Sequence, residues 1–345
     1  MGDTSAVNRG RSRGESARRP ARAGGFDWSA PVNRRPAAPG LRGAVGIWIV
    51  VGVLAIADFA TYARVPVAEL YHVSRGGLAG GASRVVTYLN YPVAFVAIAL
   101  LGLAVSRVLA EPQALSRAGR WAVGIAAAFG LALCLVAVWP GVVNDGNLDA
   151  RPINALPALG VALAAGLTVV AALRTGLGQR RPWSSADRAR LAAVAVMGAL
   201  ALPWIMAIVG VYVGDVPLIS GLFMSQQTLP GDPLPAVHLG EHHGLDGVFF
   251  AASSLMLMRS LGRVPAAWLR VPLSFYLGLM LAYGLANAGN DFSLEQVVKR
   301  GWATHELPSV LRPAPTPAWG VILSATVIIG VLLLQASRSS RQAEG

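Results

Sequence analysis

Hydrophobic residues occur along the chain in runs of about 20, and charged residues or stretches rich in Pro and Gly separate the runs. A helix rises 1.5 Å per residue, so such a run spans roughly 30 Å, the thickness of the hydrocarbon core of a bilayer. The pattern predicts an all-α, polytopic integral membrane protein. The predicted spans are 44–64, 86–106, 121–142, 155–173, 191–213, 245–262, 271–289 and 318–336.

Arginines concentrate in alternate connections between the predicted spans. Because positive residues are retained on the cytoplasmic side of a membrane, we expect the arginine-rich connections there. The connection 214–244 contains no Lys or Arg, and 143–154 contains only Arg151. Eight spans with both termini in the cytoplasm keep this alternation. The orientation depends on Arg107, Arg117, Arg120, Arg174, Arg180, Arg181, Arg188, Arg190, Arg259, Arg263, Arg270, Arg338 and Arg341.

The even number of spans permits a parallel repeat of four plus four helices. Two short similarities support it. Tyr62 and Pro66 follow the first span as Tyr212 and Pro217 follow the fifth, and an Asn-Asp pair follows both the third and the seventh spans.

Composition supports the membrane assignment, because 54% of residues are hydrophobic and only 13% are charged. The net charge of +12 by itself suggests nucleic-acid binding, but the location of the charge does not. Residues 1–43 hold nine arginines and three acidic residues among Pro, Gly and Ser, so half of the excess lies in this segment. We predict a disordered basic cytoplasmic tail that is attracted to anionic lipid and binds no nucleic acid. Residues 44–336 form the transmembrane domain, and 337–345 a short cytoplasmic tail.

Lys299 is the only lysine among 29 basic residues, and Ala and Gly are abundant, which is typical of a GC-rich bacterial genome. We therefore expect a bacterial cytoplasmic (plasma) membrane. The first apolar run is of full length and resembles a retained signal anchor. Cys134 is the single cysteine, which excludes disulfides and thiolate metal clusters within one chain. Any metal ligands must then be histidines and carboxylates.

All five histidines fall in connections predicted to face outward: His72, His238, His242, His243 and His305. The densest group, within residues 237–247, leads into the sixth span. A helix from Pro235 to about Arg259 would place His238, His242 and Asp246 on one stripe and three glycines, Gly240, Gly244 and Gly247, on the opposite face. We expect the first face to ligate and the second to pack against a neighbouring helix.

Two imidazoles and a carboxylate at four-residue spacing can bind Zn²⁺ or another divalent ion and leave a coordination position open for water. His72 and His305 are second-rank ligands, and Asp58 and Glu241 are candidate catalytic carboxylates. Two alternatives remain open. The histidines could hydrogen-bond to loops or headgroups at a wet membrane interface, or they could sense or relay protons.

Asp58 is an ionisable residue inside the outer part of the first span, where it is costly unless it faces a cavity or a partner. We predict that Asp58 shares one cavity with His238, His242 and Asp246. The alternatives are a hydrogen bond to Thr61 or Tyr62, or snorkelling to the interface.

The connection 291–316 contains Ser293-Leu294-Glu295-Gln296, the pattern of a helix capping box. We predict a short separate helix there, lying along the outer surface with Glu295 and Lys299 away from its apolar side.

The expected function is that of a divalent-metal-dependent membrane enzyme acting on a lipid-linked or extracytoplasmic substrate. A non-enzymatic transporter or metal handler is the first alternative. An assembly subunit of a membrane complex, acting through a partner subunit, is the second.

Overall fold

The structure is a computed structural model that describes residues 39–64, 80–139, 151–178, 182–209, Pro217 and 242–344. Every regular element in these residues is a helix, which confirms the all-α prediction. The predicted tail, residues 1–43, lies outside the described residues up to position 38. At the other end, helix α11 continues to Glu344, so almost all of the predicted second tail has helical backbone.

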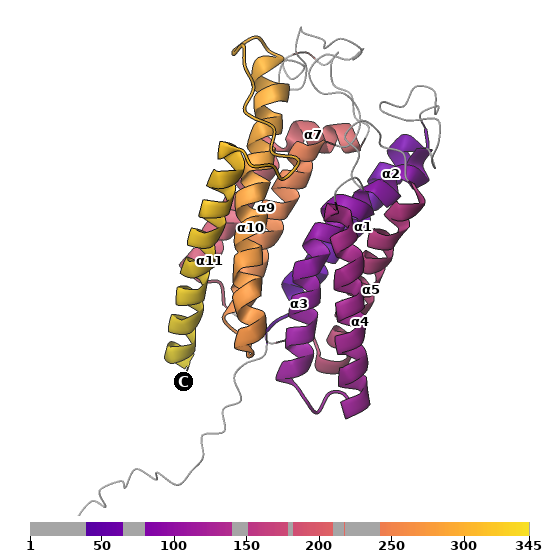
Figure 1. The fold of residues 1–345 in the computed structure, drawn as a ribbon, viewed down its shortest axis with the longest axis vertical. Helices are drawn as coiled ribbons and strands as arrows, with labels where there is room; N and C mark the ends of the chain where they lie inside the picture. Colours follow the sequence, from indigo (N-terminus) through magenta and orange to yellow (C-terminus); the bar gives the residue numbers. More distant parts are fainter. Residues whose placement is uncertain are drawn as a thin grey trace, which may run out of the picture. The chain divides into compact units, whose positions relative to one another are not determined.

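The described residues of the first half form four helical passes that alternate in direction (Figure 1). The second pass is composite, because a π-helical turn, η2, joins two α-helices end to end. Helix α3 lies at the centre of this half and packs against α4 and α5, while α2 packs against α1. The bounds are α1 Arg42–Tyr62, α2 Gly80–Tyr88, η2 Leu89–Val93, α3 Ala94–Ala110, α4 Arg117–Leu135, η3 Val136–Val138, η4 Pro152–Asn154 and α5 Ala155–Thr175.

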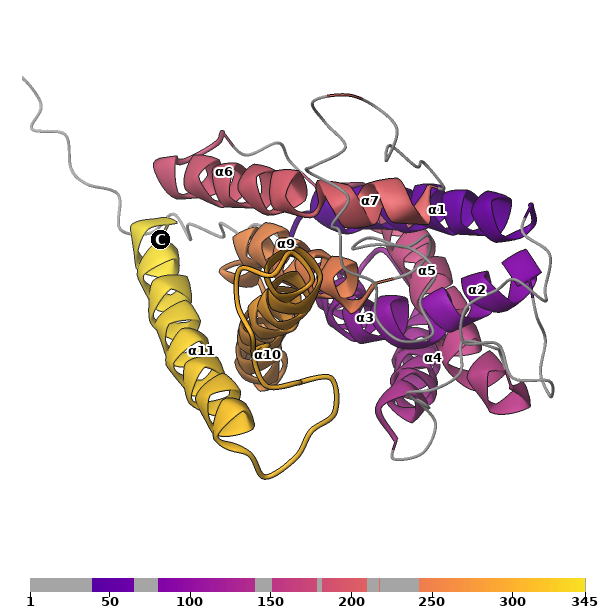
Figure 2. The ribbon, with the colours of Figure 1, turned by 90° about the horizontal axis from the view of Figure 1, so that it is seen from above.

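The second half continues the alternation with α6 and α7 in one direction, then α9, α10 and α11. Helix α10 packs against both α9 and α11, and α6 packs against α9. Viewed from above in Figure 2, α9 lies between α10 on one side and α1 with α6 on the other. The bounds are α6 Ser185–Leu200, α7 Leu202–Ile208, α9 His243–Leu261, α10 Ala267–Phe292, η5 Ser293–Val298 and α11 Pro317–Glu344.

Six of the described helices are long and apolar enough to cross a membrane: 42–62, 80–110, 117–138, 152–175, 267–298 and 317–339. The predicted span 191–213 corresponds to α6 and α7, which are separated at Ala201 just before Pro203. Proline lacks the backbone donor that a continuous helix requires. The predicted span 245–262 corresponds to α9, which buries Asp246, Ser253 and Ser254 inside the bundle. Eight spans, their orientation and the repeat therefore stay predictions.

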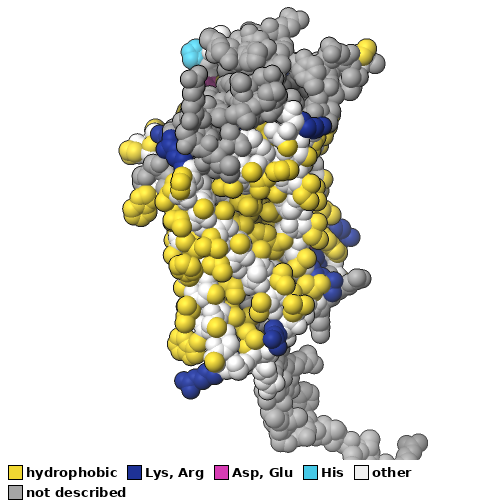
Figure 3. All heavy atoms as spheres, turned by 90° about the vertical axis from the view of Figure 1, so that its right-hand side faces the viewer, with side chains coloured by type: hydrophobic (Ala, Val, Ile, Leu, Met, Phe, Trp, Pro, Cys, Tyr) yellow, Lys and Arg dark blue, Asp and Glu magenta, His cyan; other side chains and the backbone are white. Residues whose placement is uncertain are grey.

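The outer faces of these helices carry large apolar side chains. Ile56 on α1, Leu173 on α5 and Val321 on α11 are about 70% exposed or more, at 72%, 79% and 69%. In Figure 3 such side chains form a broad band over one face, with Lys and Arg side chains at its border. Monomeric soluble proteins rarely expose apolar patches of this extent, so the surface is that of a membrane protein.

Glycines bring α9 and α10 into backbone contact near the beginning of α9. A Cβ atom on Gly247 would lie 2.5 Å from the Gly284 carbonyl oxygen, and one on Gly284 would lie 2.6 Å from the Gly247 oxygen. Gly244 is equally crowded, against Trp204 of α7 and the Asp291 carboxylate. The predicted packing face is thus confirmed for Gly244 and Gly247, and it places polar residues of α9 beside those of α10.

Candidate metal centre

The structure describes four of the seven residues proposed as ligands or catalytic groups: Asp58, His242, Asp246 and His305. The other three, His72, His238 and Glu241, lie outside the described residues. Asp58, His242 and Asp246 are buried at one end of the helix bundle, where α1, α9 and α10 meet. His305 is exposed and its Nδ1 atom lies 2.7 Å from the hydroxyl of the adjacent Thr304.

His242 precedes α9 and is not part of it. Its backbone is extended, with φ −121° and ψ 136°, and the helix begins at His243. The prediction of one continuous helix from Pro235 through His242 is therefore wrong at this position. The physical reason is that the carboxylate of Asp291 accepts the Gly244 N–H, at 2.9 Å, and so caps a helix that begins here.

His242, Asp291 and Glu295 form the closest group of possible metal ligands among the described residues. One ligand atom from each lies within 4.8 Å of the others, and all three side chains are buried. The His242 Nδ1 atom is 3.9 Å from Asp291 Oδ2. One imidazole and two carboxylates match the ligands of Zn²⁺ and other borderline divalent ions, and this buried group could hold a metal ion.

Besides His242, Gly244 and His243 also contact the Asp291 carboxylate. The Gly244 N–H donates to Oδ2, and His243 Nε2 lies 3.7 Å from Oδ1. One turn earlier on α10, the Asn287 amide donates to the His243 carbonyl oxygen at 3.0 Å. The beginning of α9 is therefore fixed by α10, and the carboxylate that faces His242 is oriented before any ion binds.

Glu295 belongs to η5, the π-helical continuation of α10. Its Oε2 atom forms a buried ion pair with Lys299 Nζ at 3.1 Å. The predicted separate surface helix is wrong, because α10 runs directly into η5 and turns Glu295 inward. The Ser293 hydroxyl, expected to cap that helix, accepts the Leu307 N–H at 3.2 Å instead.

Asp58 on α1 is fully buried, and neither of its carboxylate oxygens accepts a hydrogen bond within the described part of the chain. The alternative of a hydrogen bond to Thr61 is wrong, because the Thr61 hydroxyl donates to the Ile208 carbonyl oxygen at 2.7 Å. The Asp58 side chain is 0% exposed. The basic group that interacts electrostatically with Asp58 is Arg84 of α2.

Close packing of α2 against α1 brings Arg84 to this position. A Cβ atom on Gly81 would lie 2.5 Å from the Phe59 carbonyl oxygen, so only glycine permits the approach. One turn later the Arg84 guanidinium lies over the Tyr62 ring, 4.6 Å from its centroid. A cation held on an aromatic face beside a buried carboxylate is a stable arrangement in low dielectric.

Asp246 connects Asp58 to the ligand group. Its carboxyl interacts electrostatically with both Asp291 and Asp58. The Tyr91 hydroxyl, from η2, pairs with the Tyr283 hydroxyl of α10 and also interacts with Asp246. The carboxyls of Asp58, Asp246 and Asp291 thus interact electrostatically in sequence, and the shared cavity of Asp58, His242 and Asp246 stays a prediction.

An aromatic layer lies beside the Tyr91–Tyr283 pair. Phe250 stacks on Tyr283 with ring centroids 5.9 Å apart, and Phe95 lies 4.7 Å from Phe250. Tyr283 also stacks on Trp319 of α11 at 5.4 Å. The aromatic rings thus form a packed apolar layer next to the polar groups.

Sequence reasoning missed Asp291, Glu295 and Lys299 as members of the site. They were assigned to an outward connection, although their four-residue spacing is the repeat of one helix face. An extension of the seventh span through residue 299 would have found them.

No protein-family model matches this sequence, and neither a curated protein nor a solved structure matches it.

Proposed function

We propose that the protein is a membrane protein that binds a divalent cation at His242, Asp291 and Glu295 and uses it to act on a lipid-linked or extracytoplasmic substrate. The observation that carries the proposal is an excess of buried negative charge. The connected cluster holds four carboxylates, Asp58, Asp246, Asp291 and Glu295, against two basic groups, Arg84 and Lys299. With all six of these groups ionised, the cluster carries two net negative charges, which is the charge that a divalent ion balances.

Because these carboxylates are buried, their stability depends on this balance of charge. A carboxylate removed from water is stable only when it is paired, hydrogen-bonded, protonated or bound to a metal. The ligand atoms of His242, Asp291 and Glu295 already lie within 4.8 Å of one another, so an ion gains three ligands with little rearrangement. Lys299, paired with Glu295, then competes with the ion for one carboxylate.

A divalent ion held by His242, Asp291 and Glu295 would supply an activated water. Asp246 interacts electrostatically with Asp291 and is outside the ligand group, so it would be the carboxylate that accepts a proton. The position of the group also supports catalysis over transport. It lies where α9 begins and α10 ends, whereas transporter sites lie near the bilayer midplane.

The decisive measurement is the metal content of purified full-length protein after equilibration with Zn²⁺ and removal of free ion. We expect one bound ion per chain in the wild type and loss of that ion in Asp291→Asn and Glu295→Gln. Asn can still accept the Gly244 N–H, so the start of α9 is preserved. Glu306→Gln is the matched control, because Glu306 is exposed on the same connection. Equal ion content in all four proteins would refute the site.

A second function, metal handling without catalysis, is favoured by one observation, the burial of all three ligands. The two functions differ in assays on the loaded protein. Catalysis predicts metal-dependent release of phosphate or another product from a bacterial lipid extract, and loss of that release in Asp246→Asn with the ion still bound. Handling predicts Zn²⁺ movement across proteoliposomes and no product.

A further inference from the structure

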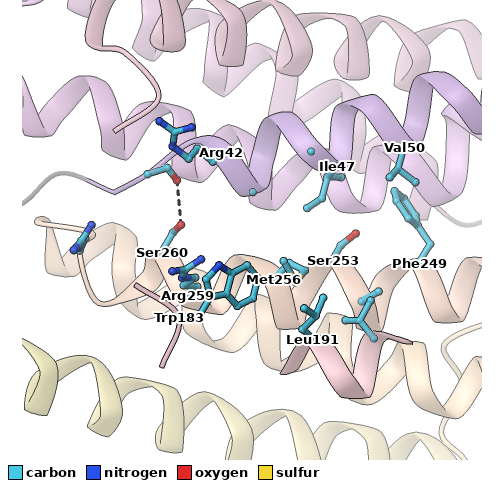
Figure 4. Close-up of a pocket in the computed structure, with 16 residues that line it drawn as sticks. Arg42, Ile47, Val50, Trp183, Leu191, Phe249, Ser253, Met256, Arg259 and Ser260 are labelled. Carbon is cyan, nitrogen blue, oxygen red and sulfur yellow. Dashed lines mark hydrogen bonds between the residues drawn. The ribbon is translucent and has the colours of Figure 1, made fainter. Parts of the chain in front are cut away.

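A cavity of about 790 Å³ lies between α1, α6 and α9, along the part of α9 that leads away from His242. Figure 4 shows α1 on one side of it and α9 on the other, with Arg42 and Arg259 toward one end and Val50 and Phe249 toward the other. The Ser260 hydroxyl donates to the Gly40 carbonyl at 3.1 Å and joins the two sides at the arginine end. This volume is in the range of sites for small ligands.

The two ends of the cavity differ in chemistry. Arg42, Arg259 and Arg263 line one end, and no acidic residue is among the described residues that line the cavity. Apolar side chains make up the remaining length, among them Ile47 and Phe249. A ligand that fits both parts has an anionic head and a hydrocarbon tail.

Arg259 is held in position at the cavity mouth. Its guanidinium lies over the Trp183 ring, 4.6 Å from the centroid, and its Nε atom is 3.4 Å from Asp187 Oδ2. The same carboxylate also pairs with Arg190 at 3.0 Å. One carboxylate is therefore shared between two arginines, while Arg42 is exposed at the same mouth. Among the described residues at this end, arginines outnumber carboxylates.

We propose that this cavity binds an anionic phospholipid, with the phosphate at the arginine end and one acyl chain along the apolar length. Guanidinium groups bind phosphate oxygens through paired hydrogen bonds, and an aromatic ring at the same depth packs against the glycerol region. Basic pockets between transmembrane helices on the cytoplasmic side take anionic lipid headgroups. The predicted orientation places these arginines on that side.

This lipid site is separate from the metal centre. His242 and Arg259 lie at opposite ends of α9, and 17 residues of helix at 1.5 Å each separate them by roughly 25 Å. A phosphate held by the arginines cannot reach an ion at His242. The proposal is therefore independent of the proposed function, and the lipid is a bound component and not the substrate.

Two kinds of variant test the site on the full-length protein in detergent. Arg42→Gln with Arg263→Gln removes charge from the head end. Gly46→Leu fills the apolar part, since Gly46 lines the cavity and nothing lies within 4 Å of a Cβ atom there. Gly52→Leu is the matched control on the same helix, because it has equal space but does not line the cavity.

The readout is the dissociation constant of the first bound phosphatidylglycerol, measured by native mass spectrometry. We expect at least tenfold weaker binding in both cavity variants, an unchanged constant in Gly52→Leu, and weaker binding of phosphatidylcholine to the wild type. Equal affinity for the two lipids, or phosphatidylglycerol binding unchanged in Gly46→Leu, would overturn the proposal. Competition by glycerol phosphate as strong as by the lipid would show an anion site and overturn the lipid assignment. Should the arginine variant unfold, Gly46→Leu alone decides.

Discussion

A buried carboxylate lies near each end of α9, and the two carboxylates differ in their hydrogen bonds and ion pairs. At the arginine end, Asp187 accepts the Ser184 N–H at 3.1 Å and pairs with Arg190 and Arg259 at 3.0 and 3.4 Å. At the histidine end, neither oxygen of Asp58 accepts a hydrogen bond within the described residues. The first carboxylate has its full set of partners, and the second does not.

This difference separates a structural role from a binding role. Burial alone would raise the pKa of Asp187, but its hydrogen bonds with Ser184 and the charges of Arg259 and Arg190 outweigh burial and lower the pKa from its ordinary value of 3.8. Asp187 is therefore charged and fixes the start of α6 against α9. The carboxylates at the histidine end retain capacity for a further partner, which we propose is a metal ion.

The largest expected effect is stabilisation by that ion at one end only. Zn²⁺ at 100 times its dissociation constant should raise the free energy of unfolding by about 2.7 kcal/mol, because it binds the folded state alone. Thermal unfolding in detergent with Zn²⁺ or chelator measures this increase. Glu295→Gln should abolish it, and Asp187→Asn should keep it. Loss of the increase in Asp187→Asn would mean that the two ends are not independent.

Removal of each carboxylate should affect stability differently. Asp187→Ala should lower the free energy of unfolding by about 2 kcal/mol, since it removes the capping-box hydrogen bond to the Ser184 N–H and two ion pairs. In chelated protein, Asp58→Asn should cause a smaller loss, because Asp58 accepts no hydrogen bond within the described residues and the substitution removes only its attraction to Arg84. Denaturant unfolding of both variants tests the contrast, and a larger loss in Asp58→Asn would refute it.

The two ends of α9 also differ in packing density. At the histidine end α9 contacts α10 through glycines, and at the arginine end it borders a cavity. Gly284→Ala should lower stability by about 1 kcal/mol net, because overpacking costs ~1–3 kcal/mol while alanine recovers ~0.5–1 kcal/mol of helix propensity. Gly289→Ala, with nothing within 4 Å of its Cβ, should be stabilising. Melting temperatures of the pair check this, and equal values would contradict the contact.

The smallest effect is the pH dependence at the arginine end. A carboxyl whose pKa is lowered on folding stabilises the folded state above its unfolded pKa of about 4, and this contribution is lost as pH falls through the folded value. The stability difference between wild type and Asp187→Asn should thus be constant near neutral pH and shrink below pH ~4. A difference that grows on acidification would show that another group carries the effect.

The fold class followed from sequence because span length and lipid-facing composition are local properties. Residues such as Ile56 and Val321 face outward and form continuous apolar runs. Helix α9 is different, since its neighbours and not lipid surround it, and Asp246 and Ser254 are tolerated inside. Hydropathy cannot distinguish such a buried helix from a less apolar surface segment.

The candidate site was predicted in part for a related reason. The clustering of histidines and acids in sequence pointed to His242, which belongs to the group that could hold a metal, whereas Asp246 stays a predicted ligand. Asp291 and Glu295 were missed because Ser293 to Gln296 satisfy a local capping pattern, whereas the chain continues α10 into η5. The tertiary contacts that turn Glu295 inward, its pair with Lys299 among them, have no local signature.

Two of the residues at the histidine end lie in π turns, Tyr91 in η2 and Glu295 in η5. A π turn holds one residue more than an α turn, and such turns concentrate at functional sites. Each π turn changes the face of the helix on which the following residues lie, within an otherwise continuous helix. Deletion of one residue from 293–298 would restore α-helical phase and rotate everything after it by about 100°. In relatives of this chain, loss of one residue at either π turn would indicate that the site is absent.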